Sequence, residues 1–221
     1  MTVTEPVTDI QARLAGLTAE EVLADAAARY AGRVAFATQL DPGDQVITHM
    51  IATAGLAIPL FTIDTGRLFP EVHDLIEQTC ARYGLDITVY CPDALEVERM
   101  VARAGVNLFR QSSFLKDGCC ETRKVRPLRR AQVGLDVVIG SRHGSRTAAG
   151  EAAVAEWDAS AGLLAIDPLA GWDATRVWEY VRAHDVPYNP LHDQGFSVID
   201  CAPCSTAAGA ASADHDHPRY P

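Results

Sequence analysis

Four cysteines in two pairs are the residues most able to carry chemistry in this chain. Cys119 and Cys120 are adjacent, and Cys201 and Cys204 form a Cys-x-x-Cys much later in the sequence. Four thiolates from two distant segments can close one four-coordinate site, either an iron–sulfur cluster or a structural zinc. The ligand pairs of zinc sites are usually spaced, so the vicinal pair favours the cluster. Cys80 and Cys91 have no such neighbour, and each is interpreted as a small buried apolar residue.

Basic residues follow the vicinal pair after about one helical turn. The run reads Cys119-Cys120-Glu121-Thr122-Arg123-Lys124. Positive charge at this position offsets the negative charge of a thiolate-bound cluster, and it can also hold a substrate anion beside the cluster.

Three loops that follow expected strands are candidate anion sites. The first begins at Thr38-Gln39-Leu40 and leads into a helix N-terminus, where free backbone N–H groups and the helix dipole attract an anion. An ordinary turn between a strand and a helix explains the same residues equally well.

The second loop reads Asp64-Thr65-Gly66-Arg67. Asp64 can accept hydrogen bonds from an adenine amino group or a ribose hydroxyl, and Gly66 permits close approach of the backbone. Arg67 can pair with a phosphate or pack on the surface. A capped turn is the alternative interpretation of this loop.

The third loop reads Arg142-His143-Gly144-Ser145-Arg146 and follows a strand that ends near Gly140. Guanidinium groups match the geometry of tetrahedral oxyanions, so this loop favours a phosphate or sulfate site over a merely flexible polar loop.

The elements that position these loops alternate between strand and helix. Strands are predicted near residues 33–37, 59–64, 86–90, 135–140 and 163–166, and helices over 19–30, 44–54, 69–83, 94–104, 119–131 and 175–184. Thr18 and Glu21 form a capping box, and Pro127 is expected to kink or split its helix. The pattern predicts an α/β fold, an open, mostly parallel five-stranded sheet with helices on both faces and ligands at the carboxyl ends of the strands. We expect a flexible segment over 1–17, one domain over 18–205 and a disordered tail over 206–221.

Composition narrows the functional class. The chain has 221 residues and a formal net charge of −10, which argues against a broad nucleic-acid footprint. The N-terminus lacks a signal-peptide pattern, and the longest apolar stretch is too short to span a bilayer, so we expect a cytoplasmic protein without membrane contact. In that reducing compartment six cysteines favour metal binding or catalysis over disulfides. The sequence leaves open whether the chain forms a homo-oligomer.

Six ordered blocks resemble one family. The chain is similar to the assimilatory adenylyl-sulfate and phosphoadenylyl-sulfate reductases, which share the adenine-nucleotide α-hydrolase-like fold of the PP-loop pyrophosphatases. The vicinal cysteines resemble the cluster-bearing branch, which mostly uses adenylyl sulfate. The matching blocks are Leu40 with Asp44-Gln45-Val46; Asp64 to Pro70; Cys119-Cys120-x-x-Arg123-Lys124-Val125-x-Pro127-Leu128; Asp167-Pro168-Leu169 with Trp172; Pro187 to Asp193; and Cys201-Ala202-Pro203-Cys204.

The resemblance implies a function and a set of site residues. A 4Fe–4S cluster would be held by Cys119, Cys120, Cys201 and Cys204, with Lys124 between cluster and substrate. Lys124 and Arg142 would support cleavage of adenylyl sulfate to sulfite and AMP, with thioredoxin as electron donor. The residues implied to bind substrate are Thr38, Leu40, Asp64, Thr65, Gly66, Arg67, Lys124, Arg142, His143 and Ser145.

The nucleophile is the largest departure from the family. Family members carry an attacking cysteine in a C-terminal Glu-Cys-Gly-Leu-His tail, and no cysteine follows Cys204 in this sequence. Asp41 also adds negative charge to the first loop, and the third loop departs from its usual pattern. Three interpretations stay open: a truncated reductase, a paralogue that uses Cys91 or a partner's thiol, and a protein with other sulfur chemistry. The last includes non-reductive sulfur transfer and adenylation. A separate alternative is a catalytically inactive partner that binds a cluster and a nucleotide.

Overall fold

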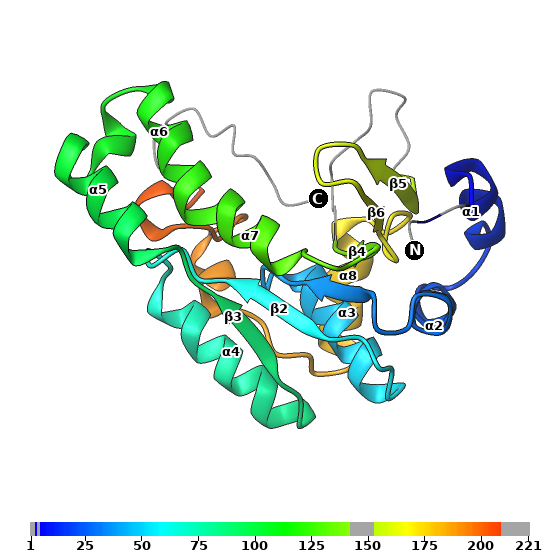
Figure 1. Ribbon diagram of the computed structural model, residues 1–221. Coiled ribbons are helices and arrows are strands. Elements are labelled where there is room, and N and C mark those ends of the chain that lie inside the picture. The colour runs from blue at the N-terminus through cyan, green and yellow to red at the C-terminus, as the bar shows by residue number, and fades with distance from the viewer. Residues whose placement is uncertain (1–2, 4, 142–152, 209–221) are drawn as a thin grey trace.

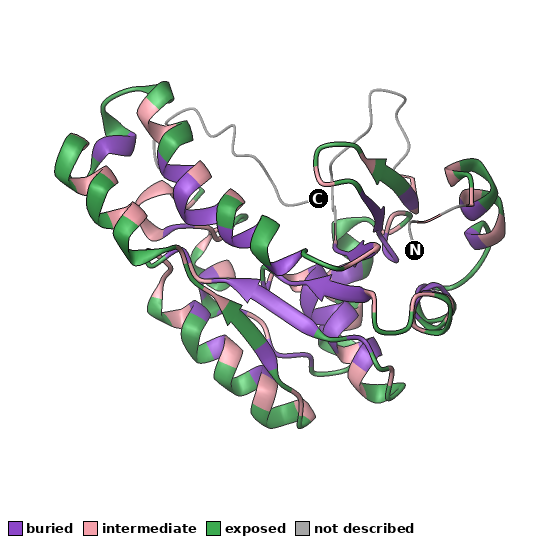
Figure 2. Cartoon of the chain, viewed as in Figure 1, coloured by how far each residue is buried: buried purple, intermediate pink, exposed green. Residues whose placement is uncertain are grey.

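Short apolar runs form the buried centre of a parallel sheet. The computed structural model describes residue 3 and residues 5–141 and 153–208. Strands β1 (Val34–Ala37), β2 (Leu60–Ile63), β4 (Val137–Ile139) and β6 (Leu163–Ile166) are buried at every position. β3 (Ile87–Tyr90) continues the parallel pairing at one edge. Continuous burial is typical of strands covered on both faces, and Figure 2 shows it along β1 and β2.

The sheet has six strands rather than the predicted five, in the order β3-β2-β1-β4-β6-β5. The additional strand is β5 (Ala155–Asp158), which pairs antiparallel with β6. Its sequence, Ala-Glu-Trp-Asp, has only one fully buried residue, Ala155, so it carries none of the apolar pattern of the central strands. The predicted fold class, a mostly parallel sheet, is confirmed.

Helices cover the two faces unequally. Figure 1 shows α3, α4 and α8 on one side of the sheet and α7 on the other. The larger core lies on the α3 side, whereas a smaller core joins Leu128 and Ala131 of α7 to β1, β2 and β4. None of the helices in the described part is long and apolar enough to cross a membrane. The helices are α2 (Ala19–Arg29), α3 (Pro42–Thr53), α4 (Pro70–Tyr83), α5 (Ala94–Ala104), α6 (Ser113–Cys120), α7 (Arg126–Ala131) and α8 (Ala174–Ala183), with 3₁₀ turns at Leu108–Arg110, Pro190–Gln194 and Ala202–Cys204.

A packed helix lies within the segment expected to be a flexible N-terminus. α1 (Val7–Leu14) places Ile10 and Leu14 in the main core, with exposed fractions of 0% and 2%. Gln11 also donates a hydrogen bond of 2.8 Å to the carbonyl of Ala155 in β5. α1 packs beside β5, the strand that was not predicted from the sequence. The two elements absent from the predicted list are therefore neighbours in the structure.

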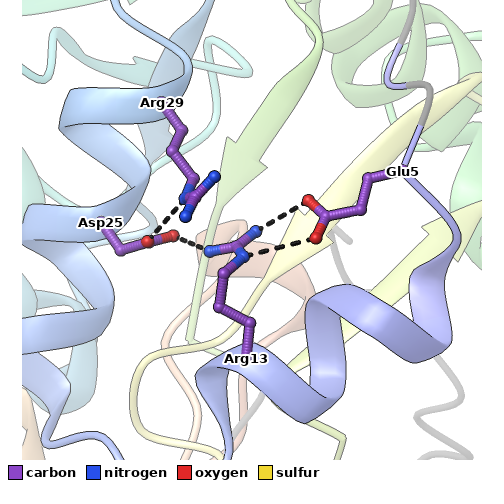
Figure 3. Close-up of polar contacts among 4 residues, drawn as sticks. All are labelled: Glu5, Arg13, Asp25 and Arg29. Atoms are coloured by element: carbon purple, nitrogen blue, oxygen red, sulfur yellow. Dashed lines mark hydrogen bonds and ion pairs between the residues drawn. The ribbon is translucent and has the colours of Figure 1, made fainter.

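Arg13 ties α1 to α2, as Figure 3 shows. Its guanidinium bonds Glu5 on one side, at 3.2 Å, and the carboxylate of Asp25 on the other. Asp25 also accepts from Arg29 at 2.8 Å. At the start of α2 the predicted capping box is present, since Thr18 and Glu21 each accept from the backbone N–H of the other.

The helical segment that carries the vicinal cysteines contains a wide turn. A π-helical turn, Glu121–Val125, joins α6 to α7, and the N–H of Arg126 donates to the carbonyl of Glu121, five residues back. Pro127 follows directly. Its nitrogen has no hydrogen to donate to the carbonyl of Arg123, so a regular α-helical ladder cannot run through this region. The predicted disturbance at Pro127 is therefore a π turn within a continuous helical segment.

Candidate functional site

The four paired cysteines meet in one pocket. Cys119 and Cys120 end α6, and Cys201 and Cys204 flank the 3₁₀ turn Ala202–Cys204. Cys204 is half-buried, whereas the other three are buried, and all four are free thiols. The remaining residues that line this pocket are Arg67, Phe109, Lys116, Arg123, Lys124 and Pro203.

The loop after β2 holds the Cys-x-x-Cys segment in place. The hydroxyl of Thr65 lies 3.1 Å from the sulfur of Cys201. The N–H of Ala202 donates to the carbonyl of Arg67 at 2.8 Å. The second candidate loop and the cysteine pocket are therefore one structural unit.

The thiols are not arranged around a single ion. Among the described residues no three His, Cys, Asp or Glu side chains come together in a way that fits one metal ion. A tetrahedral zinc with Zn–S bonds of about 2.3 Å needs such a tight group. A cluster makes a smaller demand, because each thiolate binds a different iron and the sulfurs stand further apart.

Lys124 is a buried cation in the pocket wall, with an exposed fraction of 5%. Its ammonium forms an ion pair with Asp200, and the other oxygen of Asp200 accepts from the N–H of Cys201 at 2.7 Å. Burial lowers the pKa of Lys124, but the charge of Asp200 and its hydrogen bond outweigh burial, so this pKa lies above its ordinary value. Lys124 thus remains charged beside the thiols.

Arg123 is a second buried cation with unused hydrogen-bonding capacity. One guanidinium nitrogen donates to the carbonyl of Thr65 at 2.7 Å, while the Nε atom has no partner among the described residues. A Cβ at Gly66 would lie 3.3 Å from the same guanidinium, and Gly66 has a φ of +71°. The close approach and the left-handed backbone both explain glycine at this position.

Burial favours the protonated form of three thiols in the pocket. It is the largest cause that raises the pKa values of Cys120, Cys201 and Cys204, and the positive charge of Lys124 opposes it in each case. Metal ligation requires thiolates, so loading of the site must release protons.

Side-chain oxygens close the loop after β1. Asp41 caps α3 and accepts from the N–H of Asp44 at 2.9 Å. Asp44 is buried, and its carboxylate accepts from the N–H of Gln39 at 2.5 Å and from the hydroxyl of Ser141 at 2.6 Å. Burial, followed by repulsion from Asp41, raises the pKa of Asp44 well above its usual range.

Thr38 and Leu40, the predicted binding residues of this loop, are buried within it. The hydroxyl of Thr38 accepts from the N–H of Leu40 at 3.0 Å. Leu40 has a φ of 61°, in the left-handed region that a branched side chain rarely adopts, so the turn is constrained.

Asp64 and Arg67 bond mainly to nearby protein groups. Asp64 accepts from the N–H of Gly66 at 2.7 Å and contacts His73 at 3.1 Å. Arg67 donates to the carbonyl of Val106 and to the side chain of Asn107, at 2.9 Å and 3.2 Å. Arg67 also lines the cysteine pocket, so its pairing with a phosphate remains a proposal.

The structure brings some predicted site residues together and leaves others untested. The four cysteines, Lys124, Thr65, Gly66 and Arg67 form one cluster of contacts. Arg142, His143 and Ser145 lie outside the described residues. Asp200 and Ser141 were not predicted, because a lone acidic residue beside a cysteine and a lone serine after a strand carry no distinctive sequence pattern.

The parallel sheet, with loops after β1, β2 and β4 at one edge, defines a PP-loop-type α/β protein that also carries a pocket of four cysteines. Residues 33–207 match the phosphoadenosine phosphosulfate reductase domain. The chain belongs to that family and is therefore an oxidoreductase that acts on a sulfur group.

Comparison with individual proteins agrees with this assignment. The adenosine 5'-phosphosulfate reductase of Allochromatium vinosum is 42% identical over 175 residues, which cover 79% of this chain and 68% of that protein. The enzyme of the same name from Burkholderia cepacia is 39% identical over 176 residues, or 79% and 70% of the two chains.

Solved structures show the same fold. The phosphoadenylyl-sulfate reductase of Candida auris, in a phosphate complex, superposes with a TM-score of 0.79 at 26% identity and covers 93% of this chain and 100% of that chain. The FMN adenylyltransferase of Candida glabrata with ATP has a TM-score of 0.55 at 14% identity, covering 91% of this chain and 64% of its own, and supports the fold alone.

Proposed function

We propose that this protein reduces adenylyl sulfate to sulfite and AMP, as a step in assimilatory sulfate reduction, with thioredoxin as the electron donor. The observation that carries the proposal is the pocket in which four cysteines and two buried cations meet at the carboxyl edge of the sheet. All six cysteines are free thiols, which supports a reducing, cytoplasmic setting.

The cysteine pocket suits a 4Fe–4S cluster held by Cys119, Cys120, Cys201 and Cys204. Lys124 and Arg123 supply positive charge, and the unpaired Nε of Arg123 can donate to an anion in the pocket. When bound, such a cluster supplies a compact, negatively charged thiolate–iron group next to Lys124.

The loops after β1, β2 and β4 suit the nucleotide. Open parallel sheets bind ligands at the carboxyl ends of their strands, at the point where the strand order reverses. β1 lies between β2 and β4, so the loops that begin at Thr38, Asp64 and Ser141 share that position. Asp64 is proposed to face the adenosine and Lys124 the sulfate, while Arg142, His143 and Ser145 remain proposals from the sequence.

The chemistry requires a thiolate that attacks the sulfur of adenylyl sulfate. The S–O bond to the phosphate breaks, AMP leaves with the electron pair of that bond, and a thiosulfonate forms on the attacking cysteine. One thiol of reduced thioredoxin then attacks the sulfur of that cysteine, sulfite leaves with the electron pair of the S–S bond, and a mixed disulfide forms. The second thiol of thioredoxin breaks the mixed disulfide, which restores the attacking thiol and leaves thioredoxin as the disulfide. Lys124 neutralises the developing charge on the sulfate during the first step.

The attacking thiol is not one of the four pocket cysteines, because those are assigned to the cluster. No cysteine follows Cys204 in the sequence given, so Cys91, a partner's thiol and a segment outside this sequence are the candidates. Of these, Cys91 is exposed, so the prediction that it is a buried apolar residue is wrong.

The test is an anaerobic assay of the 221-residue chain with adenylyl sulfate and reduced thioredoxin, in which AMP and sulfite are quantified. Equal amounts of the two products would support the proposal, and Cys91→Ser then decides whether that thiol attacks. Parallel reactions with the 3'-phosphorylated substrate test the choice of nucleotide. Tight binding without either product would require a thiol from outside this sequence, and ATP turnover to AMP and pyrophosphate would support the adenylating alternative.

A further inference from the structure

Lys124, the cation proposed to face the substrate sulfate, is already paired with a carboxylate. Its ammonium contacts Asp200, which directly precedes Cys201 and accepts the N–H of that cysteine at 2.7 Å. Asp200 is therefore fixed at the rim of the cysteine pocket. An anion that binds Lys124 must share this charge-assisted bond or displace Asp200.

A carboxylate of the protein also occupies the N-terminus of α3, where it accepts a hydrogen bond from a backbone N–H group. A phosphate at a helix N-terminus binds free backbone N–H groups. Here Asp41 accepts from the N–H of Asp44 at 2.9 Å, and Asp44 accepts from the N–H of Gln39 at 2.5 Å. Ser141 bonds both carboxylates, at 3.3 Å to Asp41 and 2.6 Å to Asp44, and so closes the arrangement from the neighbouring strand.

The two carboxylate positions belong to one edge of the sheet. β1 pairs with β2, so the loops after them are neighbours. The β2 loop in turn contacts Cys201 through Thr65 at 3.1 Å. A nucleotide that extends along this edge meets both positions.

We propose that Asp41 and Asp200 are internal counter-anions that set the affinity of this pocket for anionic nucleotides. This inference rests on the proposed function, since it requires the nucleotide to bind at this edge. Asp200 acts through Lys124 and is a positioning residue, while Asp41 acts at the N-terminus of α3. Both weaken binding of the phosphate–sulfate portion and leave recognition of the adenosine portion unchanged.

The test compares binding of adenylyl sulfate, AMP and adenosine to the wild type, Asp200→Asn and Asp41→Asn, at matched iron content, by isothermal titration calorimetry. Asp200→Asn should bind adenylyl sulfate roughly tenfold more tightly, the effect of about one charge-assisted hydrogen bond. Asp41→Asn should give a smaller gain, and neither should change adenosine binding. Asp185→Asn is the matched control, because it removes one charge from an exposed residue paired with Arg82.

A double-mutant cycle tests whether Asp200 acts through Lys124. In a Lys124→Met background the gain from Asp200→Asn should vanish, because no ammonium is released. A structural role of Asp200 would instead give the same change in both backgrounds.

The lysine content allows a direct readout on the wild type. Lys116 and Lys124 are the only lysines in the sequence, so ¹⁵N-lysine labelling gives two side-chain signals. Adenylyl sulfate should shift the Lys124 signal by more than adenosine does, and Asp200→Asn should shift it without ligand. This measurement holds even if the Asp200 variants fail to fold.

The outcomes separate the two proposals. If the wild type binds adenylyl sulfate but Asp200→Asn binds it no more tightly, or tightens adenosine equally, the counter-anion inference is wrong and the proposed function stands. An unchanged Lys124 signal on adenylyl sulfate binding also overturns the inference. If neither the wild type nor any variant binds adenylyl sulfate, both proposals fail.

Discussion

The loops after β1 and β2 lie side by side at one edge of the sheet, yet they satisfy their polar groups in different ways. In the β1 loop, backbone N–H groups are bonded by carboxylates from the same segment, Asp41 and Asp44. In the β2 loop, backbone carbonyls are bonded by distant donors, Arg123 at 2.7 Å and the N–H of Ala202 at 2.8 Å.

This difference separates a self-contained loop from one that depends on the rest of the site. The β1 loop is bonded chiefly by itself and by Ser141, which follows the adjacent strand β4. The β2 loop depends on residues far along the chain, because Arg123 and Ala202 donate the hydrogen bonds to its backbone carbonyls. We therefore expect changes at the β2 side to disturb the cysteine pocket. Changes at the β1 side should leave that pocket intact and alter local stability, pH dependence and the affinity for anionic nucleotides.

The largest expected effect is the loss of the proposed cluster from the cysteine pocket, which the β2 loop supports through Cys201. Cys120→Ser and Cys201→Ser each remove one thiolate ligand, so each should abolish the visible absorbance of anaerobically purified protein. Absorbance spectra and iron content check this, with Cys91→Ser as a control that keeps both. Unchanged iron in the two pocket variants would show that the cluster is assigned to the wrong residues.

Gly66→Ala should be the most destabilising change in the β2 loop itself. The alanine must adopt a left-handed backbone conformation at φ +71°, and its Cβ lies 3.3 Å from the guanidinium of Arg123. Gly84→Ala is a matched control, since Gly84 has a φ of +62° and nothing within 4 Å of a Cβ. Urea unfolding should give a loss of about 2–3 kcal/mol for Gly66→Ala and about 1–2 kcal/mol for Gly84→Ala. Equal losses would mean that contact with Arg123 is unimportant.

The β1 loop should give the protein a distinct pH dependence. Burial raises the pKa of Asp44, so the folded protein keeps this proton at pH values where the unfolded chain has lost it. The free energy of unfolding should therefore fall as pH rises from about 4 to the raised pKa, by about 1.4 kcal/mol for each unit of pKa shift. Asp44→Asn should lack this component. Urea unfolding of both proteins between pH 4 and 8 checks it, and parallel pH profiles would contradict it.

The smallest expected effect concerns Thr65. Thr65→Val removes the hydroxyl that contacts the sulfur of Cys201 at 3.1 Å and accepts from the N–H of Arg67 at 3.2 Å. We expect a loss of about 1 kcal/mol in the free energy of unfolding, together with a small shift of the visible spectrum. Thr65→Ser keeps the hydroxyl and should restore both, whereas identical behaviour of the two variants would exclude the hydroxyl as the cause.

The central sheet could be predicted from the sequence because its strands are apolar runs buried on both faces. β1, β2, β4 and β6 all have this character. β5 and α1 could not be predicted in the same way, because half of the residues in each are polar and contacts between the two elements help to hold them, as in the bond from Gln11 to Ala155. The sequence of a short segment does not reveal that contact with another element will stabilise it.

The residue types of the cysteine pocket could be predicted from the sequence, but the hydrogen bonds and ion pairs between them could not. The pairing of thiols and the nearby basic residues are visible in the sequence around Cys119 and Lys124. The partner of Lys124 is 76 residues away, at Asp200, so only the folded chain reveals it. The same holds for Ser141, which reaches across from β4 to the first loop.

The π turn between α6 and α7 makes this segment sensitive to changes of length. Deletion of one residue from Glu121–Val125 would remove the residue that widens this turn, while Pro127 would still interrupt the α-helical hydrogen bonds. The same deletion would rotate Cys119 and Cys120 by about 100° around the helix axis relative to α7, the angle of one α-helical residue. A shorter chain would thus keep a helical segment here but turn the two cysteines away from Cys201 and Cys204, so a single-codon deletion should disturb the cysteine pocket more than the fold.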